Sequence, residues 1–146
     1  TLAMTPLRQL TGSSWPLRFR RMLGLFSFFY VCVHLMTYIF LDHFFEWDEI
    51  IRDIVKRPYI TIGILAFALL IPLAATSTKN MMKRLGRRWK SLHKLIYAIA
   101  ILGVLHFFLL VKADLREPFI YALILFSLLL VRYKPELLNK LSFRSH

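Results

Sequence analysis

The chain has 146 residues, of which 58% are hydrophobic, and its formal net charge is +12. This composition excludes a small soluble domain and is typical of a membrane protein. The positive charge does not indicate nucleic-acid binding, because the basic residues form groups that alternate with long apolar segments, as they do in the loops of membrane proteins. We therefore expect membrane lipid, and no nucleic acid, around this chain.

The apolar segments predict the helices in chain order. Residues 1–11 are too short to cross a bilayer, which takes about 20 residues. We expect them to be the end of a helix that begins earlier in a longer protein, since the chain has neither an initiator Met nor a signal peptide. Further along, apolar runs predict four spanning helices, over residues 22–41, 58–78, 92–112 and 118–132.

One amphipathic segment separates the first two spans. Within residues 44–56 the apolar residues recur three and four positions apart, which predicts a helix lying at the membrane interface. A docking surface for an outer partner is the less favoured interpretation, since the interfacial one explains the same pattern.

The loop charges predict the orientation of the helices. Basic groups precede the first span, lie between the second and third, and follow the fourth, whereas acidic residues outnumber basic ones over residues 42–57. Under the positive-inside rule, the basic loops and the C-terminus lie in the cytoplasm. The predicted fold is an all-α, multi-pass transmembrane bundle that forms a single domain.

Three of the five histidines lie in the apolar runs: His34, His93 and His106. An ionisable side chain inside a bilayer is costly and is a candidate functional residue. His34 lies thirteen residues beyond Arg21, and His106 lies sixteen beyond Lys90. At about 1.5 Å per residue, both reach a similar depth in the outer half of the membrane. Two facing imidazoles can supply both axial ligands of a b-type haem, which favours electron transfer. A structural histidine is the alternative for either residue alone.

The basic side of the membrane offers further candidates. His93 lies beside Lys94, where water or lipid headgroups could satisfy it, and it is about 140° around an ideal helix from His106. A second, inner haem would need a partner on the first span, where Arg20 and Arg21 stand. These two arginines could bind haem propionates or a flavin phosphate, or they could simply set the topology.

The sequence lacks the residues that several other functions would require. The helical cores contain no acidic residue, so a proton-coupled transporter is less favoured than an electron carrier. There is no glycine-rich phosphate loop for NAD(P)H, and no Cys-x-x-Cys-His motif for covalent haem attachment. The single Cys32 cannot form an intrachain disulfide. We expect an electron-transfer subunit that takes electrons from another protein, rather than a stand-alone catalyst.

A series of motifs runs along nearly the whole chain. They are Arg20-Arg21-Met22-Leu23-Gly24-Leu25, His34-Leu35 with Tyr38, Arg57-Pro58-Tyr59-Ile60-Thr61 with Gly63, Thr76-Ser77-Thr78, Leu85-Gly86, Trp89, Leu92-His93, Tyr97, His106 and Arg132-Tyr133-Lys134. In this order they resemble the MsrQ (YedZ) family of haem-binding membrane subunits, in the ferric reductase-like transmembrane group.

The resemblance implies a cytochrome b of the bacterial inner membrane. Such a subunit passes electrons from a cytoplasmic flavin reductase to a periplasmic molybdopterin methionine sulfoxide reductase, which repairs oxidised envelope proteins. His34, His93 and His106 occupy the family's histidine positions. The resemblance also implies FMN, for which these residues give no site. The chain departs from the family in lacking its first helix and most of its second, and in carrying Arg20 or Arg21 where related oxidases have another haem ligand.

The resemblance leaves the haem count open between one, which we expect, and two. Two rival functions also remain. A cytochrome b subunit that oxidises quinol would accept electrons from quinol but not from a flavin reductase. A membrane anchor for a periplasmic enzyme would contain no haem, and its histidines would be structural.

Overall fold

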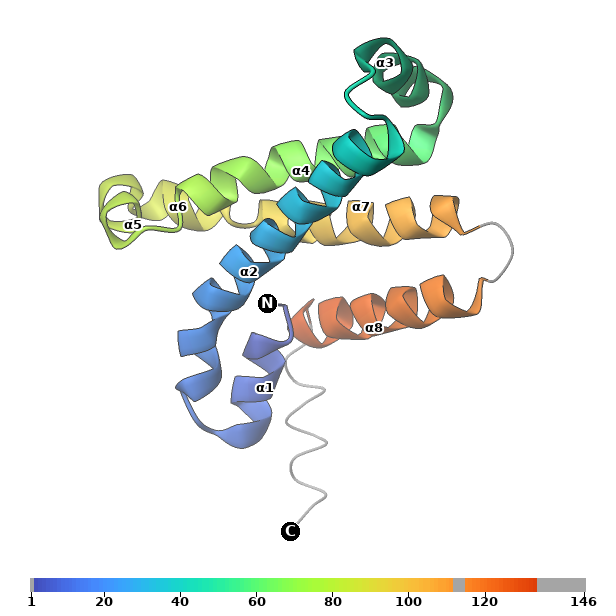
Figure 1. Ribbon diagram of the computed structural model, residues 1–146. Coiled ribbons are helices and arrows are strands. Elements are labelled where there is room, and N and C mark those ends of the chain that lie inside the picture. Colours follow the sequence, from blue (N-terminus) through green and yellow to red (C-terminus); the bar gives the residue numbers. More distant parts are fainter. Residues whose placement is uncertain (1, 112–114, 134–146) are drawn as a thin grey trace.

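The computed structural model describes residues 2–111 and 115–133, apart from the side chain of Leu17 (Figure 1). In chain order, the elements are α1 (Met4–Thr11), α2 (Trp15–Thr37), the π-helical turn η1 (Tyr38–Asp42), α3 (Trp47–Lys56), α4 (Pro58–Ala75), α5 (Lys79–Leu85), α6 (Arg87–Leu92), α7 (Leu95–Leu110) and α8 (Arg116–Tyr133). The described residues contain helices and turns but no strand, which confirms the all-α prediction.

Three segments of the described chain are long and apolar enough to cross a membrane: Arg18–Asp42, Pro58–Ala75 and Arg87–Leu110. They coincide with the first three predicted spans. The fourth predicted span corresponds to α8, which is 18 residues long and carries charged residues at both ends. The multi-pass membrane fold is therefore confirmed.

Several helix boundaries differ from the predicted ones for local reasons. The interfacial helix begins at Trp47 rather than at residue 44, because Phe44 and Phe45 have φ values of 42° and 65°, which an α-helix cannot contain. Pro58 then starts α4 at a position where its missing N–H costs nothing. Residue 112, the predicted end of the third span, and residues 134–146, with the predicted cytoplasmic C-terminus, lie outside the described residues.

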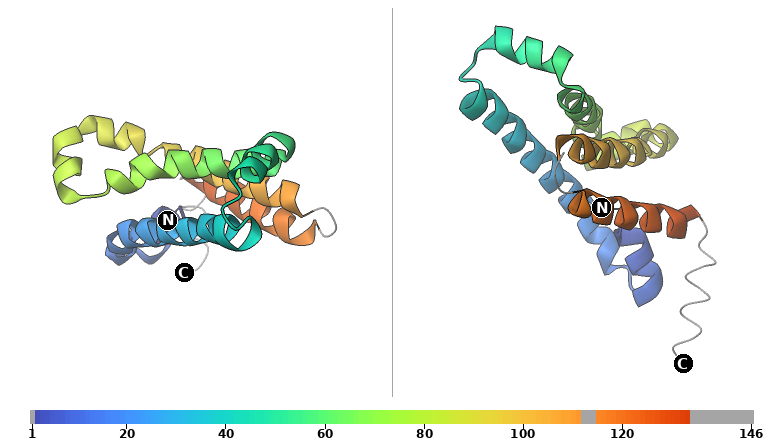
Figure 2. Two further views of the ribbon diagram at one scale, coloured as in Figure 1. Left: turned by 45° about the horizontal axis from the view of Figure 1, so that its top comes forward. Right: turned by 90° about the vertical axis from the view of Figure 1, so that its right-hand side faces the viewer.

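The antiparallel pair α4 and α7 forms the centre of the molecule (Figure 1). α8 lies along the other side of α7, α1 contacts α2 and α8, and α2 crosses α4 obliquely (Figure 2). Few of the described side chains are buried, among them Ile60, Leu70 and Leu73 of α4, whereas large apolar side chains of α2 and α8 are widely exposed. Such exposure suits helices that face lipid.

The two ends of the α4–α7 pair carry opposite charge. α3 lies at one end and the α5–α6 hairpin at the other (Figure 1). We call the first the acidic end, defined by Asp42, Glu46, Asp48, Glu49 and Asp53. We call the second the basic end, defined by Lys79, Lys83, Arg84, Arg87, Arg88, Lys90 and Lys94.

Candidate functional site

The structure brings together His34 of α2 and His106 of α7. Their ring centres are 6.2 Å apart, and the ring planes are inclined by 81°. A metal–imidazole bond of about 2 Å on each side, with about 1 Å from each nitrogen to its ring centre, puts two ligand rings about 6 Å apart. The separation of this pair therefore fits two imidazoles that share one metal ion.

A hydrogen bond to α4 orients the His106 ring. Its Nδ1 lies 2.7 Å from the backbone carbonyl oxygen of Tyr59, in the first turn of that helix. A carbonyl oxygen only accepts, so Nδ1 carries the proton and Nε2 keeps its lone pair. Histidines that bind metals commonly donate their other ring N–H in this way. His106 therefore has Nε2 available as a ligand.

The contact between α7 and α4 depends on Gly63. A Cβ atom at this position would lie 2.9 Å from Nδ1 of His106 and 3.0 Å from its Cε1. Gly63 follows Tyr59 by one helical turn, so it lies on the same face of α4, beside the accepting carbonyl. The absence of a side chain gives the imidazole room to reach that oxygen. Gly63 was identified from the sequence only as part of a motif, and its role in making room for His106 was not predicted.

Both histidines line one cavity of about 630 Å³ between α2, α4 and α7. Cavities that hold small molecules and cofactors are of this size. The wall toward the basic end is apolar and includes Val31, Ile64, Phe67, Leu70 and Ile99. The wall toward the acidic end is polar and includes Tyr38, Asp42, His43, Asp53, Arg57 and Tyr59. The cavity thus suits a flat ligand with one apolar and one polar edge.

Asp53 connects the polar groups of this wall. Its carboxylate lies 3.3 Å from Nε2 of His43 and 3.3 Å from Nε of Arg57. Nη1 of Arg57 donates to the hydroxyl of Tyr59 over 3.1 Å. This hydrogen bond, followed by the charge of Asp53, raises the pKa of Arg57, so the guanidinium remains charged. Sequence reasoning missed this network, although its residues flank the ends of the predicted spans.

His93 is separated from the other two histidines and does not line the cavity. Its Nε2 lies 3.1 Å from Oγ1 of Thr76, and its ring stacks on Trp89 with the centres 4.0 Å apart. The Thr76 hydroxyl donates to the carbonyl of Pro72, so it accepts from the N–H of His93. Trp89 in turn donates to the carbonyl of Thr76 over 2.9 Å. This network joins α6 to the end of α4.

The structure distinguishes the two candidate arginines. Arg20 is partly buried and within electrostatic range of Arg132, Tyr97 and His93, whereas Arg21 is exposed. The guanidinium of Arg132 lies over the Tyr97 ring, 5.1 Å from its centre. Arg20 therefore belongs to a cationic cluster on the side of His93, remote from the cavity lined by His34 and His106.

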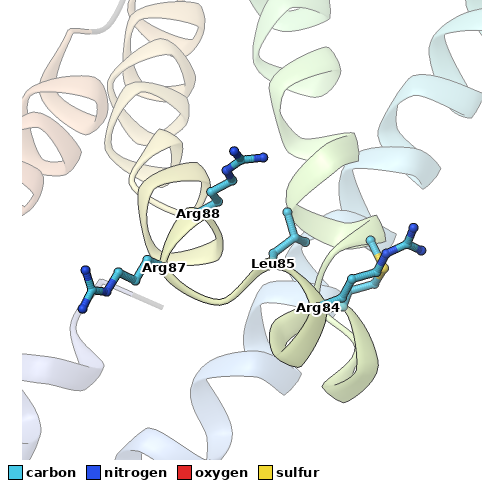
Figure 3. Close-up of a pocket in the computed structure, with 5 residues that line it drawn as sticks. Arg84, Leu85, Arg87 and Arg88 are labelled. Atoms are coloured by element: carbon cyan, nitrogen blue, oxygen red, sulfur yellow. The ribbon is translucent and has the colours of Figure 1, made fainter.

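A second hollow, of about 510 Å³, lies at the turn between α5 and α6. Gly86 makes this turn with a φ of 52°, a conformation that favours glycine. Figure 3 shows that Arg87 points away from Arg84 and Arg88, and that the three guanidinium groups lie apart from one another around the turn. They do not converge on a common anion, and the arrangement is that of a basic loop that joins the two membrane helices α4 and α7.

Comparison with known proteins gives a consistent result. The family model described as "Ferric reductase like transmembrane component" matches residues 1–104. Three similar proteins carry the name protein-methionine-sulfoxide reductase heme-binding subunit MsrQ. The one from Rhodospirillum rubrum is 58% identical, over 99% of this chain and 70% of its own length. The chain belongs to the MsrQ family.

The other two MsrQ relatives extend further beyond the chain. The protein of Herminiimonas arsenicoxydans is 55% identical, over 90% of this chain and 62% of its own length. That of Xanthomonas campestris pv. campestris is 60% identical, over 88% of this chain and 59% of its own length. No solved structure gives a significant match. The resemblance inferred from the ordered motifs is confirmed.

Proposed function

We propose that the chain binds a b-type haem with His34 and His106 as axial ligands and carries electrons across the bacterial inner membrane. The observation that carries this proposal is the pair of imidazoles facing each other across one cavity, 6.2 Å apart. The MsrQ relatives are named as heme-binding subunits, which supports the same cofactor.

The residues of the cavity fit haem in three respects. The donors are two imidazoles, His106 is held in the tautomer that leaves Nε2 free, and Gly63 supplies the space for that arrangement. Haem held by both imidazoles would supply one-electron redox chemistry rather than oxygen activation. The apolar wall would exclude water, while the Tyr59 carbonyl would strengthen His106 as a ligand.

We propose a direction of electron flow from the charges of the two ends. The positive-inside rule puts the basic end in the cytoplasm and the acidic end in the periplasm. A cytoplasmic flavin reductase would deliver electrons at the basic end, and a periplasmic molybdopterin methionine sulfoxide reductase would receive them at the acidic end. α3 exposes Trp47, Ile51 and Val55 there, which suits a helix at the lipid interface.

For the basic end we propose secondary roles. A second haem held through Nε2 of His93 would break the hydrogen bond from that atom to Thr76, so one haem is the preferred count. If FMN binds, the guanidinium groups of Arg20 and Arg132 could pair with its phosphate.

The test is reduction of the purified chain, followed by its haem absorption bands. We expect NAD(P)H with a flavin reductase to reduce the haem, and a periplasmic methionine sulfoxide reductase with its substrate to reoxidise it. Reduction by quinol alone would instead support the quinol-oxidising rival. A folded chain that binds no haem would overturn the proposal and leave only the anchor.

A further inference from the structure

We propose that the polar rim of the cavity, defined as Tyr38, His43 and Arg57, binds a carboxylate group of the porphyrin, so that the propionate edge of the haem faces the acidic end. This inference rests on the proposed haem function and adds an orientation for the cofactor and a binding site for its carboxylates.

Two buried polar atoms of the rim lack a hydrogen bond. Both the hydroxyl of Tyr38 and Nδ1 of His43 are inaccessible and form none with the described residues. Glu49 approaches Nδ1 to only 3.7 Å, which is too far for a hydrogen bond. The two rings are in contact, with centres 4.6 Å apart, so their polar atoms belong to one small region. Buried polar groups are normally satisfied, and a pair left without partners indicates a missing acceptor or donor.

The rim lies next to the two candidate haem ligands. Tyr38 follows His34 by one helical turn, a rise of about 6 Å toward the acidic end. Arg57 donates to the hydroxyl of Tyr59, whose backbone carbonyl holds His106. Side chains of the rim are thus adjacent to both candidate ligands. The three rim residues line the same cavity as His34 and His106. A porphyrin held by the histidines would meet these polar groups at its edge.

The rim offers hydrogen-bond donors to a carboxylate, although two aspartates also line this wall. Asp53 is already engaged by Nε2 of His43 and Nε of Arg57. The guanidinium has five N–H donors, so some remain after its contacts with Asp53 and Tyr59. The Tyr38 hydroxyl, which has no hydrogen-bond partner among the described residues, offers a further donor. Asp42 is the remaining acid of the wall.

The opposite edge of the cavity cannot take the carboxylates. Its lining includes Val31, Phe67 and Leu70, which offer no hydrogen bond to a charged group. Burying a carboxylate there without a partner would be strongly unfavourable. Of the two orientations of the porphyrin in its plane, the one with propionates toward the rim is therefore favoured.

The experiment compares haem b with haem dimethyl ester, in which both propionates are blocked, by titration into the haem-free chain in detergent. Tyr38→Phe and Arg57→Gln remove rim donors. Tyr30→Phe, on the exposed side of α2, and Arg52→Gln, on α3 outside the cavity lining, are the matched controls. We expect the wild type to prefer haem b by about tenfold to hundredfold, the value of a hydrogen bond to a charged group. Each rim variant should lose most of that preference while binding the ester as the wild type does, and the controls should keep it.

Three results would overturn the inference. A preference that survives in both rim variants but disappears in Arg20→Gln would put the carboxylates at the basic end. A wild type that binds both porphyrins equally would mean that the rim does not bind the propionates. A wild type that binds neither would overturn the haem proposal itself, and with it this inference.

Discussion

Replacing Gly63 by alanine tests whether the contact between α4 and α7 positions the candidate ligand His106. The new Cβ would lie 2.9 Å from Nδ1, about 0.5 Å closer than the 3.4 Å at which ordinary contact begins. The backbone on one side is fixed in a helix, so the imidazole has to move, and the 2.7 Å bond to the Tyr59 carbonyl has to lengthen or break.

The expected free-energy changes distinguish an effect of Gly63→Ala on haem binding from an effect on folding. Overpacking costs about 1–3 kcal/mol, and the lost hydrogen bond costs about 1 kcal/mol. Alanine in a helix returns about 1 kcal/mol relative to glycine. The net loss of stability is therefore small to moderate, whereas disturbing the partner of a metal ligand typically costs tenfold to a hundredfold in affinity, a range of about 1.4–2.7 kcal/mol.

The assay is haem titration with the absorption and electron paramagnetic resonance spectra of the ferric protein. Ala68→Val is the control, because it also adds bulk to α4 but Ala68 is exposed and does not line the cavity. We expect Gly63→Ala to bind haem about tenfold to a hundredfold more weakly, with shifted spectra, and Ala68→Val to bind it as the wild type does. Equal losses in both variants, or none in Gly63→Ala, would refute a positioning role for Gly63.

Two further predictions concern the ends of the bundle. Thr76→Val removes the buried hydroxyl that accepts a hydrogen bond from His93. The protein should therefore lose about 1–3 kcal/mol of stability while keeping its haem. A thermal unfolding curve with haem absorbance measures both quantities, and loss of haem at unchanged stability would contradict a structural role for this contact. Asp53→Asn weakens the contacts with His43 and Arg57 and should destabilise the fold only slightly, because the Arg57 side chain is exposed and its ion pair is screened. Denaturant unfolding in low and high salt measures this, and a salt-independent effect would speak against the ion pair.

Local pattern was sufficient to predict the membrane helices. Runs of apolar residues gave α2, α4 and α7 because crossing a bilayer requires a length of apolar chain and little else. The boundary before α3 was not predictable in the same way, since the positive φ values of Phe44 and Phe45 are not encoded by residue type; large aromatic residues rarely adopt them.

The candidate site was only partly predictable. Counting residues from the basic loops gave His34 and His106 a similar depth, and the structure places their rings near each other. The hydrogen-bond partners of those rings could not be predicted from the sequence, because the bond from His106 to Tyr59 joins residues 47 positions apart. The separation of His93 likewise depends on Thr76 and Trp89, which come from different helices or turns and meet only through tertiary packing.

The most direct test of the account is the haem content and ferric spectrum of the wild type and of three single alanine variants, at His34, His93 and His106. We expect one low-spin haem per wild-type chain, loss of haem or of the low-spin signal in His34→Ala and in His106→Ala, and retention of both in His93→Ala. An unchanged low-spin spectrum in His34→Ala and His106→Ala would contradict the central claim that these two residues hold the haem.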